Sequence, residues 1–511
     1  MRGGILLATI NAKWIHPSLA LRLLKANLGS LEERCTIMEF ALRQPLREKT
    51  EPILAARPRI LGLSVSIWNL EATLELLAEL RKAWDGNAGG EGGRPFVVLG
   101  GPEVSHLPGN AEIFRFADCR VLGEGETAFR ELCEAVMSGD GNPGARDSVL
   151  SETGEKTSCR KLFSETGENL PAANPGFRHE DLALLKTGYR LYTDEDLRKK
   201  LVYVEASRGC RFSCEFCLSS RSDGGGRKIR EFPLEPFLAE MDGLVRGGVR
   251  TFKFLDRSFN VNAARAKRIM EFFLERLEAA DRSSGVCDPP FTVHFEMVPF
   301  RFPPELMETL TRFPPGSLRL EIGIQTLNSG VSALIGRPSN PARELEALRF
   351  LWQKTGAIIH ADLIAGLPGE DAASFARGFD LLWEALSSPP GAAPDFRSRA
   401  EVQLGILKLL PGAPIARHSA AFGMRYNAAP PYEVTETAAV PARELDRIKN
   451  FARFWELIVN RGLADPGPSP VYARFMALAD ALLARFGRSW GIPKAELREA
   501  VAEATAARCR P

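Results

Sequence analysis

The sequence lacks any apolar run of the ~18 residues that a membrane-spanning helix requires, so we expect no transmembrane segment. It also lacks an excess of one charge. The formal net charge is +2, which gives no strong attraction to nucleic acid or to an anionic membrane. A short apolar run at residues 5–10 is followed by no small-residue cleavage site, which favours a strand over a secretion signal. These absences predict a cytoplasmic protein with no membrane or nucleic-acid partner.

A disulfide framework is also not indicated. The chain has nine cysteines, an odd number, and a long chain without a secretion signal is expected to keep its thiols reduced. Six of them are scattered, and we expect these to act as small hydrophobic residues. Three fall within eight consecutive residues and need a separate explanation.

The sequence contains alternating strand and helix patterns. A chain of 511 residues is expected to form two to four domains of roughly 100–200 residues each. Residues 1–137 predict a parallel sheet with helices on both faces, a Rossmann-like (flavodoxin-like) α/β domain. The expected strands are 5–10, 35–42, 59–66, 95–101 and 120–123, and the expected helices are 18–31, 69–84 and 126–137.

The middle of the chain differs from its flanks. Residues 138–200 are rich in Gly, Ser, Glu, Thr and Pro and contain the near-duplicate segments 151–156 and 164–169, which predicts a linker or surface insertion. Strand–helix alternation resumes over 201–415 with six units, two fewer than the eight of a closed TIM barrel. A partial (β/α)6 barrel is therefore expected, followed by a small α-rich region over 416–511.

The three clustered cysteines are Cys210, Cys214 and Cys217, directly after the first strand of the second α/β region. Three thiolates this close can bind one soft metal centre. Gly209 permits a sharp turn into the loop, and Phe212 and Phe216 are expected to shield the centre from water.

Two kinds of metal centre fit three thiolates. A [4Fe–4S] cluster held at three corners leaves one iron open for chemistry, as catalytic zinc keeps an open position. A structural zinc site needs a fourth ligand, and no Cys or His follows within the next sixty residues. The spacing CxxxCxxC after a first barrel strand, with an aromatic residue before the last Cys, resembles the radical SAM superfamily. The resemblance implies that S-adenosylmethionine (SAM) binds the open iron and is reductively cleaved to a 5′-deoxyadenosyl radical.

The same resemblance suggests residues that contact SAM. They lie on or after successive barrel strands, including the segments 252–260, 294–297, 321–325 and 362–370. The Gly-Gly-Glu that is frequent on the second strand of the family is absent. A carboxylate on a barrel strand can also simply pair with an arginine or satisfy backbone groups. The candidates are Phe216, Asp256, Asn260, Glu296, Glu321, Gln325, Ile364 and Gly366.

An α/β domain before such a barrel resembles the B12-binding domain of one class of radical SAM proteins. Small residues end its expected strands, where ligands of open α/β sheets bind. The Asp-x-His-x-x-Gly motif that supplies a histidine to cobalt is absent, so we expect cobalamin without a lower histidine ligand; a domain that kept the fold and lost the cofactor is the alternative. The candidate residues are Asn11, His16, Ser64, Ser66, Trp68, Gly100, Gly101, Pro102, Glu103, Gly123, Glu124, Gly125 and Glu126. His16 can instead be a loop histidine that bonds to other groups of the protein.

The resemblance implies a cobalamin-dependent radical SAM enzyme that moves a methyl group to an unactivated carbon of a small-molecule or peptide substrate. A reductant such as flavodoxin or ferredoxin would supply the electron. The residues after the barrel, from Leu409 to Glu433, resemble an uncharacterised domain of a bacterial subset of this class. Alternatives are a rearrangement or cyclisation with the same cofactors, and a redox sensor. A methylthiotransferase is a weaker alternative because the first domain lacks a second cysteine triad.

Overall fold

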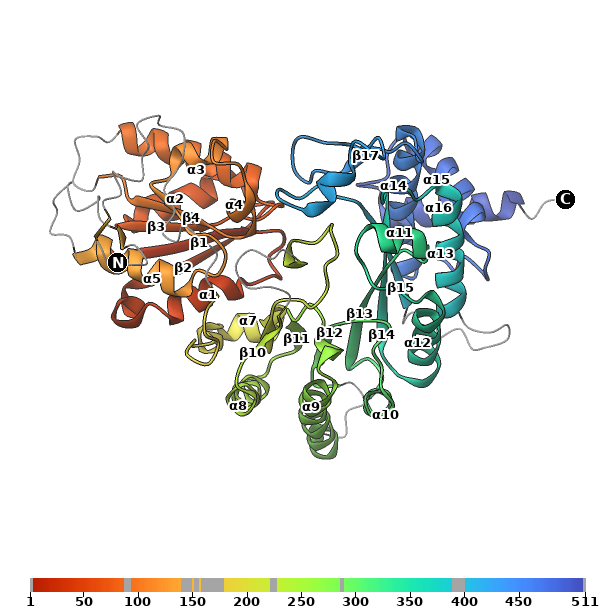
Figure 1. The fold of residues 1–511 in the computed structure, drawn as a ribbon, viewed down its shortest axis with the longest axis horizontal. Coiled ribbons are helices and arrows are strands. Elements are labelled where there is room, and N and C mark those ends of the chain that lie inside the picture. Colours follow the sequence, from red (N-terminus) through yellow and green to blue (C-terminus); the bar gives the residue numbers. More distant parts are fainter. Residues whose placement is uncertain are drawn as a thin grey trace. The chain divides into compact units, whose positions relative to one another are not determined.

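The structure is a computed structural model that describes residues 3–86, 93–138, 149–150, 156–157, 179–220, 228–284, 289–387 and 400–508. Its contacts divide the chain into two compact units, Met1–Ser207 with Ser222–Thr251, and Arg208–Arg221 with Phe252–Pro511. Figure 1 labels the helices and strands of both units.

The first unit contains a parallel sheet of five strands in the order β2-β1-β3-β4-β5. This is the flavodoxin-like order, and it confirms the predicted fold class. The strand order reverses between β1 and β3, and a crevice at the carboxyl ends of such strands is where open α/β sheets bind ligands. The strands are β1 (Ile5–Asn11), β2 (Cys35–Ala41), β3 (Ile60–Ser64), β4 (Phe96–Gly100) and β5 (Cys119–Arg120).

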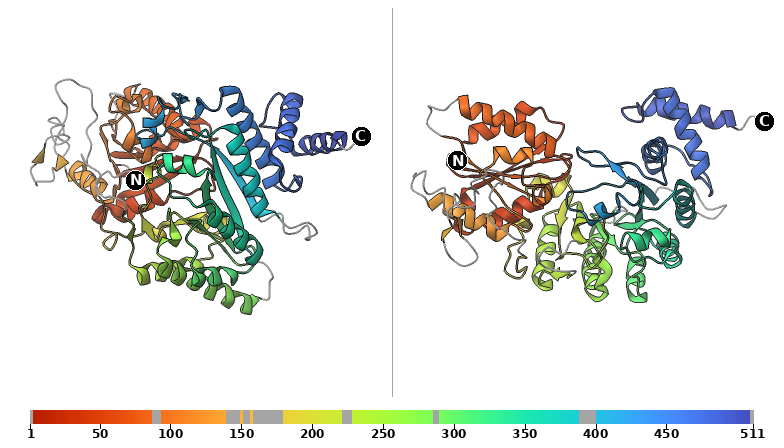
Figure 2. Two further views of the ribbon diagram at one scale, coloured as in Figure 1. Left: turned by 45° about the vertical axis from the view of Figure 1, so that its right-hand side comes forward. Right: turned by 45° about the horizontal axis from the view of Figure 1, so that its top comes forward.

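Helices cover both faces of this sheet, as Figure 2 shows. Alternate residues of β1 face opposite sides, so Leu6 belongs to the core formed with α2 and α3, and Leu7 belongs to the core formed with α1 and α5. The sequence did not predict α2, because Pro52 and several charged residues interrupt the apolar periodicity of this helix. The helices are α1 (Leu19–Ala26), η1 (Gly29–Arg34), α2 (Leu46–Ala56), α3 (Leu70–Gly86), α4 (Pro102–His106), η2 (Glu112–Phe116) and α5 (Glu126–Ser138).

Part of the predicted linker packs against this sheet. Arg22 of α1 is buried and forms ion pairs with Asp196 at 2.7 Å and with Glu39 at 2.9 Å, so its charge is compensated inside the unit. The near-duplicate at 151–156 and 164–169 lies outside the described residues, apart from one residue of β7. The described elements here are β6 (Val149–Leu150), β7 (Lys156–Thr157), η4 (Tyr189–Leu191) and α7 (Asp194–Lys199).

The second sheet has six strands in the order β15-β14-β13-β12-β11-β8, which follows the chain. Because the sheet ends at β8 and β15, it is an open, partial barrel, as predicted from six strand–helix units. Its strands are β8 (Val202–Val204), β11 (Thr251–Phe254), β12 (Thr292–Met297), β13 (Leu318–Gln325), β14 (Ile358–Ala365) and β15 (Ala400–Ile406). The helices between them are α8 (Leu234–Arg246), α9 (Ala263–Ser284), α10 (Pro304–Thr311), α11 (Ser329–Leu334), α12 (Pro341–Lys354) and α13 (Ala372–Leu386).

The C-terminal region is mainly helical but begins with a two-stranded antiparallel sheet that the sequence did not predict. From residue 472 onward this α-rich region forms two helices, because Gly487 adopts a left-handed conformation and ends the first of them. The elements are η8 (Pro414–His418), β16 (Arg425–Tyr426), β17 (Val434–Glu436), α14 (Ala442–Trp455), the π-helical turn η9 (Glu456–Asn460), α15 (Tyr472–Phe486) and α16 (Lys494–Arg508).

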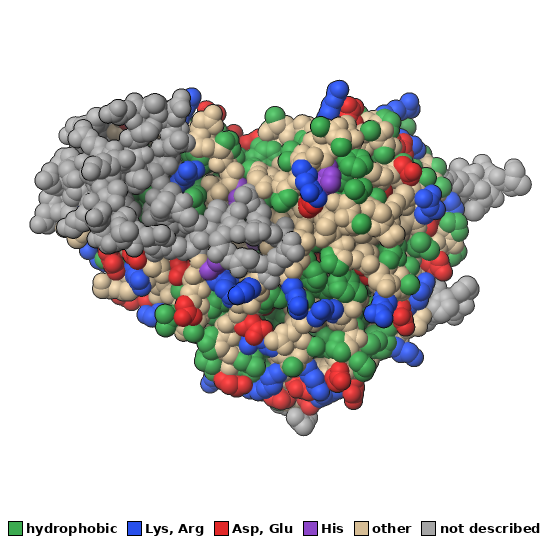
Figure 3. Space-filling model, in the orientation of Figure 1, with side chains coloured by type: hydrophobic (Ala, Val, Ile, Leu, Met, Phe, Trp, Pro, Cys, Tyr) green, Lys and Arg blue, Asp and Glu red, His purple; other side chains and the backbone are tan. Residues whose placement is uncertain are grey.

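No helix among the described residues combines the length and apolar character needed to cross a membrane. Basic and acidic side chains are interspersed on the face drawn in Figure 3, where the described surface shows no broad area of a single charge sign.

A buried carboxyl in the second unit leads to a prediction about pH. Glu370, after β14, accepts a hydrogen bond from Thr326 Oγ1 at 2.6 Å, and burial raises its pKa from 4.5 to about 7. Its stabilising contribution is therefore present below about pH 4.5 and is lost as the pH rises through about 7. Glu370→Gln is expected to raise the melting temperature at pH 8 but not at pH 5. At about 1.4 kcal/mol per pKa unit, the gain in unfolding free energy at pH 8 is up to about 3 kcal/mol. Glu384→Gln, at an exposed position of α13, controls for loss of a charge, and an equal shift at both pH values would contradict the assignment.

Candidate active site

The three clustered cysteines line one cavity of about 210 Å³ in the second unit. They lie in the loop between β9 (Ser207–Arg208) and η5 (Leu218–Ser220), and Gly209 begins this loop with a φ of 95°. This conformation is the sharp turn that the sequence predicted, and it is open to glycine at little cost. The fold therefore brings Cys210, Cys214 and Cys217 to a common wall.

The separation of the thiols distinguishes the two predicted kinds of centre. Among the described residues, no three His, Cys, Asp or Glu side chains lie close enough to surround a single metal ion. Zinc requires all its ligands within about 2.0–2.3 Å of one ion. In a cubane each thiolate binds a different iron, so its thiolates stand farther apart. The donor set is three thiols with no fourth Cys or His among the residues that line the cavity, which fits a [4Fe–4S] cluster better than a structural zinc site.

Two of these thiols have raised pKa values. Burial is the main cause for both Cys210 and Cys214, and it is partly offset by the Phe212 backbone N–H and by the Arg337 guanidinium, respectively. Arg337 Nη1 lies 3.8 Å from Cys214 Sγ, and its Nη2 donates to the carbonyl oxygen of Gly323. Arg337 therefore places a positive charge next to the proposed cluster ligand.

The cysteine loop is fixed by the segment after α11 and by η8. The Glu215 backbone N–H donates to Ile335 O at 2.9 Å, and Ser213 Oγ donates to Gly336 O at 3.2 Å. The Glu215 carboxylate is held by Arg417 and by His418, whose Nε2 lies 2.9 Å away. Charge-assisted bonds of this kind are the stronger ones, so the loop is positioned without a metal.

Four of the residues predicted to contact SAM line this cavity, namely Phe216, Glu296, Glu321 and Gln325. They come from the cysteine loop and from β12 and β13, so three separate segments meet here. The sequence did not single out several other lining residues, which are Arg257, Met297, Val298, Phe300, Arg337, Pro338 and Asp362. Phe212, predicted to shield the cluster, also lines the cavity and packs edge-on against Phe300 at 5.8 Å between ring centroids.

The other four SAM candidates do not line it. Asn260 donates to Val298 O at 2.9 Å and to Arg301 O at 2.6 Å and accepts from the Val298 N–H at 2.8 Å, so its amide joins backbone segments. Asp256 is buried, Ile364 lines a different cavity, and a side chain on Gly366 would meet Val434. Contacts of these four residues with SAM stay predictions without support from the cavity.

Gln325 has an uncommon backbone conformation. Its φ is 70°, and the pairing of β13 with β14 is shifted between Gly323 and Gln325. A non-glycine residue in this region costs of order 1 kcal/mol, and such residues concentrate at functional sites. The Gln325 side-chain amide packs against Gly323, so a Cβ at position 323 would force this amide to move.

Three carboxyls of the cavity differ in charge. Glu321 Oε2 lies 3.2 Å from both His294 Nε2 and Lys253 Nζ, and these partners lower its pKa to about 2. Burial raises the pKa of Glu296 and raises that of Asp362 further, and the negative charge of Glu321 adds to both effects. The cavity therefore holds one carboxyl with a lowered pKa and two carboxyls with raised pKa values.

In the first unit, the cobalamin candidates gather at the carboxyl edge of the sheet, where they follow β1, β3, β4 and β5. Asn69, which the sequence did not single out, is buried between the first two of these strand ends. Its Nδ2 donates to Ile10 O at 2.8 Å and its Oδ1 accepts from the Ser66 N–H at 2.8 Å. The buried Asn69 amide therefore links the ends of β1 and β3, the two strands between which the strand order reverses.

Exposed aromatic side chains mark this edge. Trp14 and Trp68 are each 50% exposed, although tryptophan is usually well buried, and Trp68 Nε1 donates to Ile10 O at 3.3 Å. Large apolar surfaces left exposed beside small-residue turns suit a large planar ligand such as cobalamin. His16 is bonded through Nδ1 to the Tyr203 hydroxyl at 2.8 Å, which agrees with the loop-histidine interpretation.

Other cobalamin candidates have structural partners. Gly101 has a φ of 102°, and a Cβ there would lie 2.5 Å from Val65 O. The backbone turn therefore requires glycine at this position whether or not cobalamin binds. Glu124 is held by Arg230 and accepts from the Glu180 N–H at 2.9 Å. Glu103 and Glu126 are buried. Their contacts with cobalamin, like those of the remaining candidates, stay predictions.

Comparison with known proteins identifies both regions. Residues 5–133 match the family described as the B12 binding domain, and residues 204–382 match the radical SAM superfamily. A cobalamin-dependent radical SAM methyltransferase, TokK from Streptomyces tokunonensis, is 26% identical over 377 residues, which are 73% of this chain and 50% of that protein. The chain thus spans about half the length of this curated relative.

Solved structures share the fold. The radical SAM methyltransferase TsrM from Kitasatospora setae, with cobalamin and a [4Fe–4S] cluster bound, has a TM-score of 0.59 at 16% identity and covers 99% of this chain and 100% of its own. The cobalamin-dependent SAM radical enzyme OxsB has a TM-score of 0.62 at 15% identity, over 94% of this chain and 70% of its own. This chain therefore carries a B12-binding domain followed by a radical SAM domain, which imply cobalamin, a [4Fe–4S] cluster and SAM as its cofactors.

Proposed function

We propose that this protein is an enzyme that reductively cleaves SAM and transfers a methyl group to an unactivated carbon of its substrate, with cobalamin as the methyl carrier. The observation that carries the proposal is the convergence of three thiols, with no fourth Cys or His in the lining, on a cavity that also holds Arg337 and three carboxyls. The relation to TokK supports methyl transfer over the alternative rearrangement or cyclisation. A one-electron donor such as flavodoxin or ferredoxin is part of the proposal.

The bound cofactors supply radical and methyl-transfer chemistry, and the chain's own residues bind and orient them. Cys210, Cys214 and Cys217 would hold the cluster. Guanidinium groups bind carboxylates in a planar, two-point geometry, so Arg337 suits the methionyl carboxylate of SAM. Protonated carboxyls can donate hydrogen bonds, which suits Asp362 to a ribose hydroxyl or another neutral acceptor.

The remaining walls exclude water. Phe212, Phe216 and Phe300 line the cavity together with Met297 and Val298. An apolar lining strengthens the polar contacts inside and protects a reactive intermediate from solvent. This is the arrangement that radical chemistry requires.

The test is anaerobic reconstitution with iron, sulfide and hydroxocobalamin, followed by reduction and incubation with SAM that carries a deuterated methyl group. We expect 5′-deoxyadenosine and methionine that keeps the deuterated methyl group from the SAM that is cleaved. We also expect unlabelled S-adenosylhomocysteine from the SAM that donates its methyl group. Cleavage without loss of the methyl group would favour a rearrangement. No cleavage by protein with a full cluster would leave the redox-sensor alternative.

Arg337 gives a more specific prediction. Arg337→Ala is expected to weaken SAM binding about 10- to 100-fold, the range for loss of a hydrogen bond between charged groups. The dissociation constant is measured by equilibrium dialysis on reconstituted protein, with cluster content checked by iron analysis. Arg343→Ala, at an exposed position of α12, is the control. Unchanged SAM affinity in the Arg337 variant, with the cluster intact, would reject this role.

A further inference from the structure

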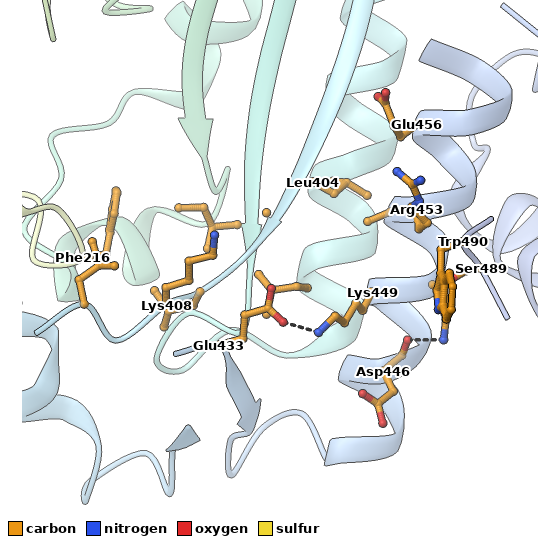
Figure 4. A pocket seen from close by; sticks show the side chains of 17 residues that line it. Phe216, Leu404, Lys408, Glu433, Asp446, Lys449, Arg453, Glu456, Ser489 and Trp490 are labelled. Carbon is orange, nitrogen blue, oxygen red and sulfur yellow. Dashed lines mark hydrogen bonds and ion pairs between the residues drawn. The ribbon is translucent and has the colours of Figure 1, made fainter. Parts of the chain in front are cut away.

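A second cavity in the same unit, of about 880 Å³, is not accounted for by the cofactors of the radical SAM domain. It lies beside β15, the last strand of the sheet, and is closed on its other side by α14 and the segment before α16. Figure 4 shows Phe216 at one end and Trp490 at the other. Its volume is within the range of about 300–1,000 Å³ that is typical of sites for organic ligands.

This cavity adjoins the cysteine cavity. Phe216, between the second and third cysteines, lines both of them. On β14, Asp362 lines the cysteine cavity and Ile364, two residues further along, lines the larger one. A molecule in the larger cavity would therefore lie next to the site where the cluster and SAM are proposed to bind.

The walls combine an apolar floor with a polar helix face. Leu404, Ile406 and Leu410 contribute to the floor, from β15 and the residues after it. Asp446, Lys449 and Arg453 of α14 line the cavity at intervals of three and four residues, which place them on one face of the helix, while Phe451 and Trp455 are buried. After α14 the helix widens into the π-helical turn η9, a form that occurs often at functional sites.

Three cations and three carboxylates line this cavity, and two of the carboxylates are already paired. Lys449 forms an ion pair with Glu433, drawn as a dashed line in Figure 4. Glu456 forms an ion pair with Arg461 at 3.1 Å.

Two further cations remain. Within the described part of the chain, no hydrogen bond or ion pair joins the side chain of Lys408 or Arg453 to another residue. The one lining carboxylate not yet counted, Asp446, is exposed at the rim. The cavity thus presents two available cations against one acidic group.

We propose that this cavity binds the substrate, and that the substrate is an organic anion with an apolar body. Lys408 and Arg453 attract its acidic group, and its apolar body lies on the floor of the cavity, with Trp490, which is 67% exposed, at one end. The assignment rests on the proposed function, because it is the adjoining cofactor site that makes this molecule a substrate. Either a guanidinium or an ammonium suits a carboxylate, sulfonate or phosphate.

The test uses two probes of similar shape, anionic 1-anilinonaphthalene-8-sulfonate and neutral N-phenyl-1-naphthylamine, titrated into the reconstituted full-length protein in a calorimeter. We expect the anion to bind more tightly, and Lys408→Glu and Arg453→Glu each to weaken it about tenfold or more without changing the affinity of the neutral probe. Lys354→Glu, the same charge change at an exposed position of α12, is the matched control.

A cavity-filling variant locates the probes. A Cβ on Gly405 would have only ordinary contacts, the nearest at 3.6 Å, so Gly405→Phe is expected to fold and to weaken both probes at least tenfold by occupying the cavity. Equal affinity of the two probes for the parent protein, or anion binding that none of these variants changes, would overturn the proposal.

Failure of the substrate-site proposal can be distinguished from failure of the proposed function. Probe binding needs no turnover, whereas cleavage of SAM by the parent protein is measured without any probe. Failure to cleave SAM with normal probe binding would reject the enzyme assignment and leave an anion-binding cavity. Cleavage of SAM with charge-insensitive probe binding would reject only the substrate class.

Discussion

Replacing Cys214 by alanine is expected to abolish both the broad absorption near 400 nm that is typical of [4Fe–4S] proteins and all cleavage of SAM. Two thiolates cannot hold the cubane at three corners, and the thiol of Cys214 is the one that also lies next to Arg337. Loss of the cluster removes the group that would pass the electron from the reductant to SAM, so the expected effect is a loss of activity below detection. The measurement is absorption, iron content and formation of 5′-deoxyadenosine after anaerobic reconstitution.

The control is Cys133→Ala, which removes a buried thiol in the core of the first unit. This variant is expected to keep the cluster and the activity, so that a deficit in the Cys214 variant cannot come from thiol loss as such. Circular dichroism checks that both variants are folded. A Cys214 variant that retains activity would show that the site is assigned wrongly, and parent protein that binds zinc instead of iron would support the structural-zinc alternative.

The cysteine site could be predicted because its pattern is local. Three cysteines, a glycine and two phenylalanines follow one strand in order, and the sequence alone places them in one loop. The six strand–helix units were also visible, because buried strands and amphipathic helices have different periods. The helix α2 was missed for the converse reason, since its periodicity is interrupted by Pro52.

Residues that reach the site through tertiary packing could not be predicted in this way. Arg337 lies 123 positions from Cys214 in the sequence and arrives through the segment after α11, which bonds to Ser213. Asn260 shows the opposite case. A polar side chain after a strand resembled a ligand-binding residue, but its amide is satisfied by the backbone around Val298. The sequence carries no sign of how such a side chain is satisfied, because the partner is fixed only when the chain has folded.

The second prediction with a large effect concerns cobalamin in the first unit. Reconstituted full-length protein is expected to hold close to one cobalt per chain, and Gly100→Leu is expected to reduce cobalamin affinity at least tenfold. Gly100 ends β4 at the carboxyl edge of the sheet, and a Cβ there would lie 3.7 Å from Val121 O, an ordinary contact. The fold therefore tolerates the substitution, while the rest of the leucine side chain occupies space at the edge where a ligand would approach the sheet.

The matched control is Gly86→Leu at the end of α3, where a Cβ would meet nothing within 4 Å. This variant has the same change of residue in the same unit, so it separates loss of the ligand site from a general effect of leucine on folding. Iron content should be equal in all three proteins, because the cluster lies in the other unit. Folded parent protein that binds no cobalamin would mean that the domain has kept its fold and lost its cofactor, and normal binding by Gly100→Leu would place cobalamin away from the end of β4. The first result would remove the methyl carrier from the proposed reaction. The second would separate cobalamin from the end of β4, although the exposed Trp14 and Trp68 mark the same carboxyl edge as a ligand site.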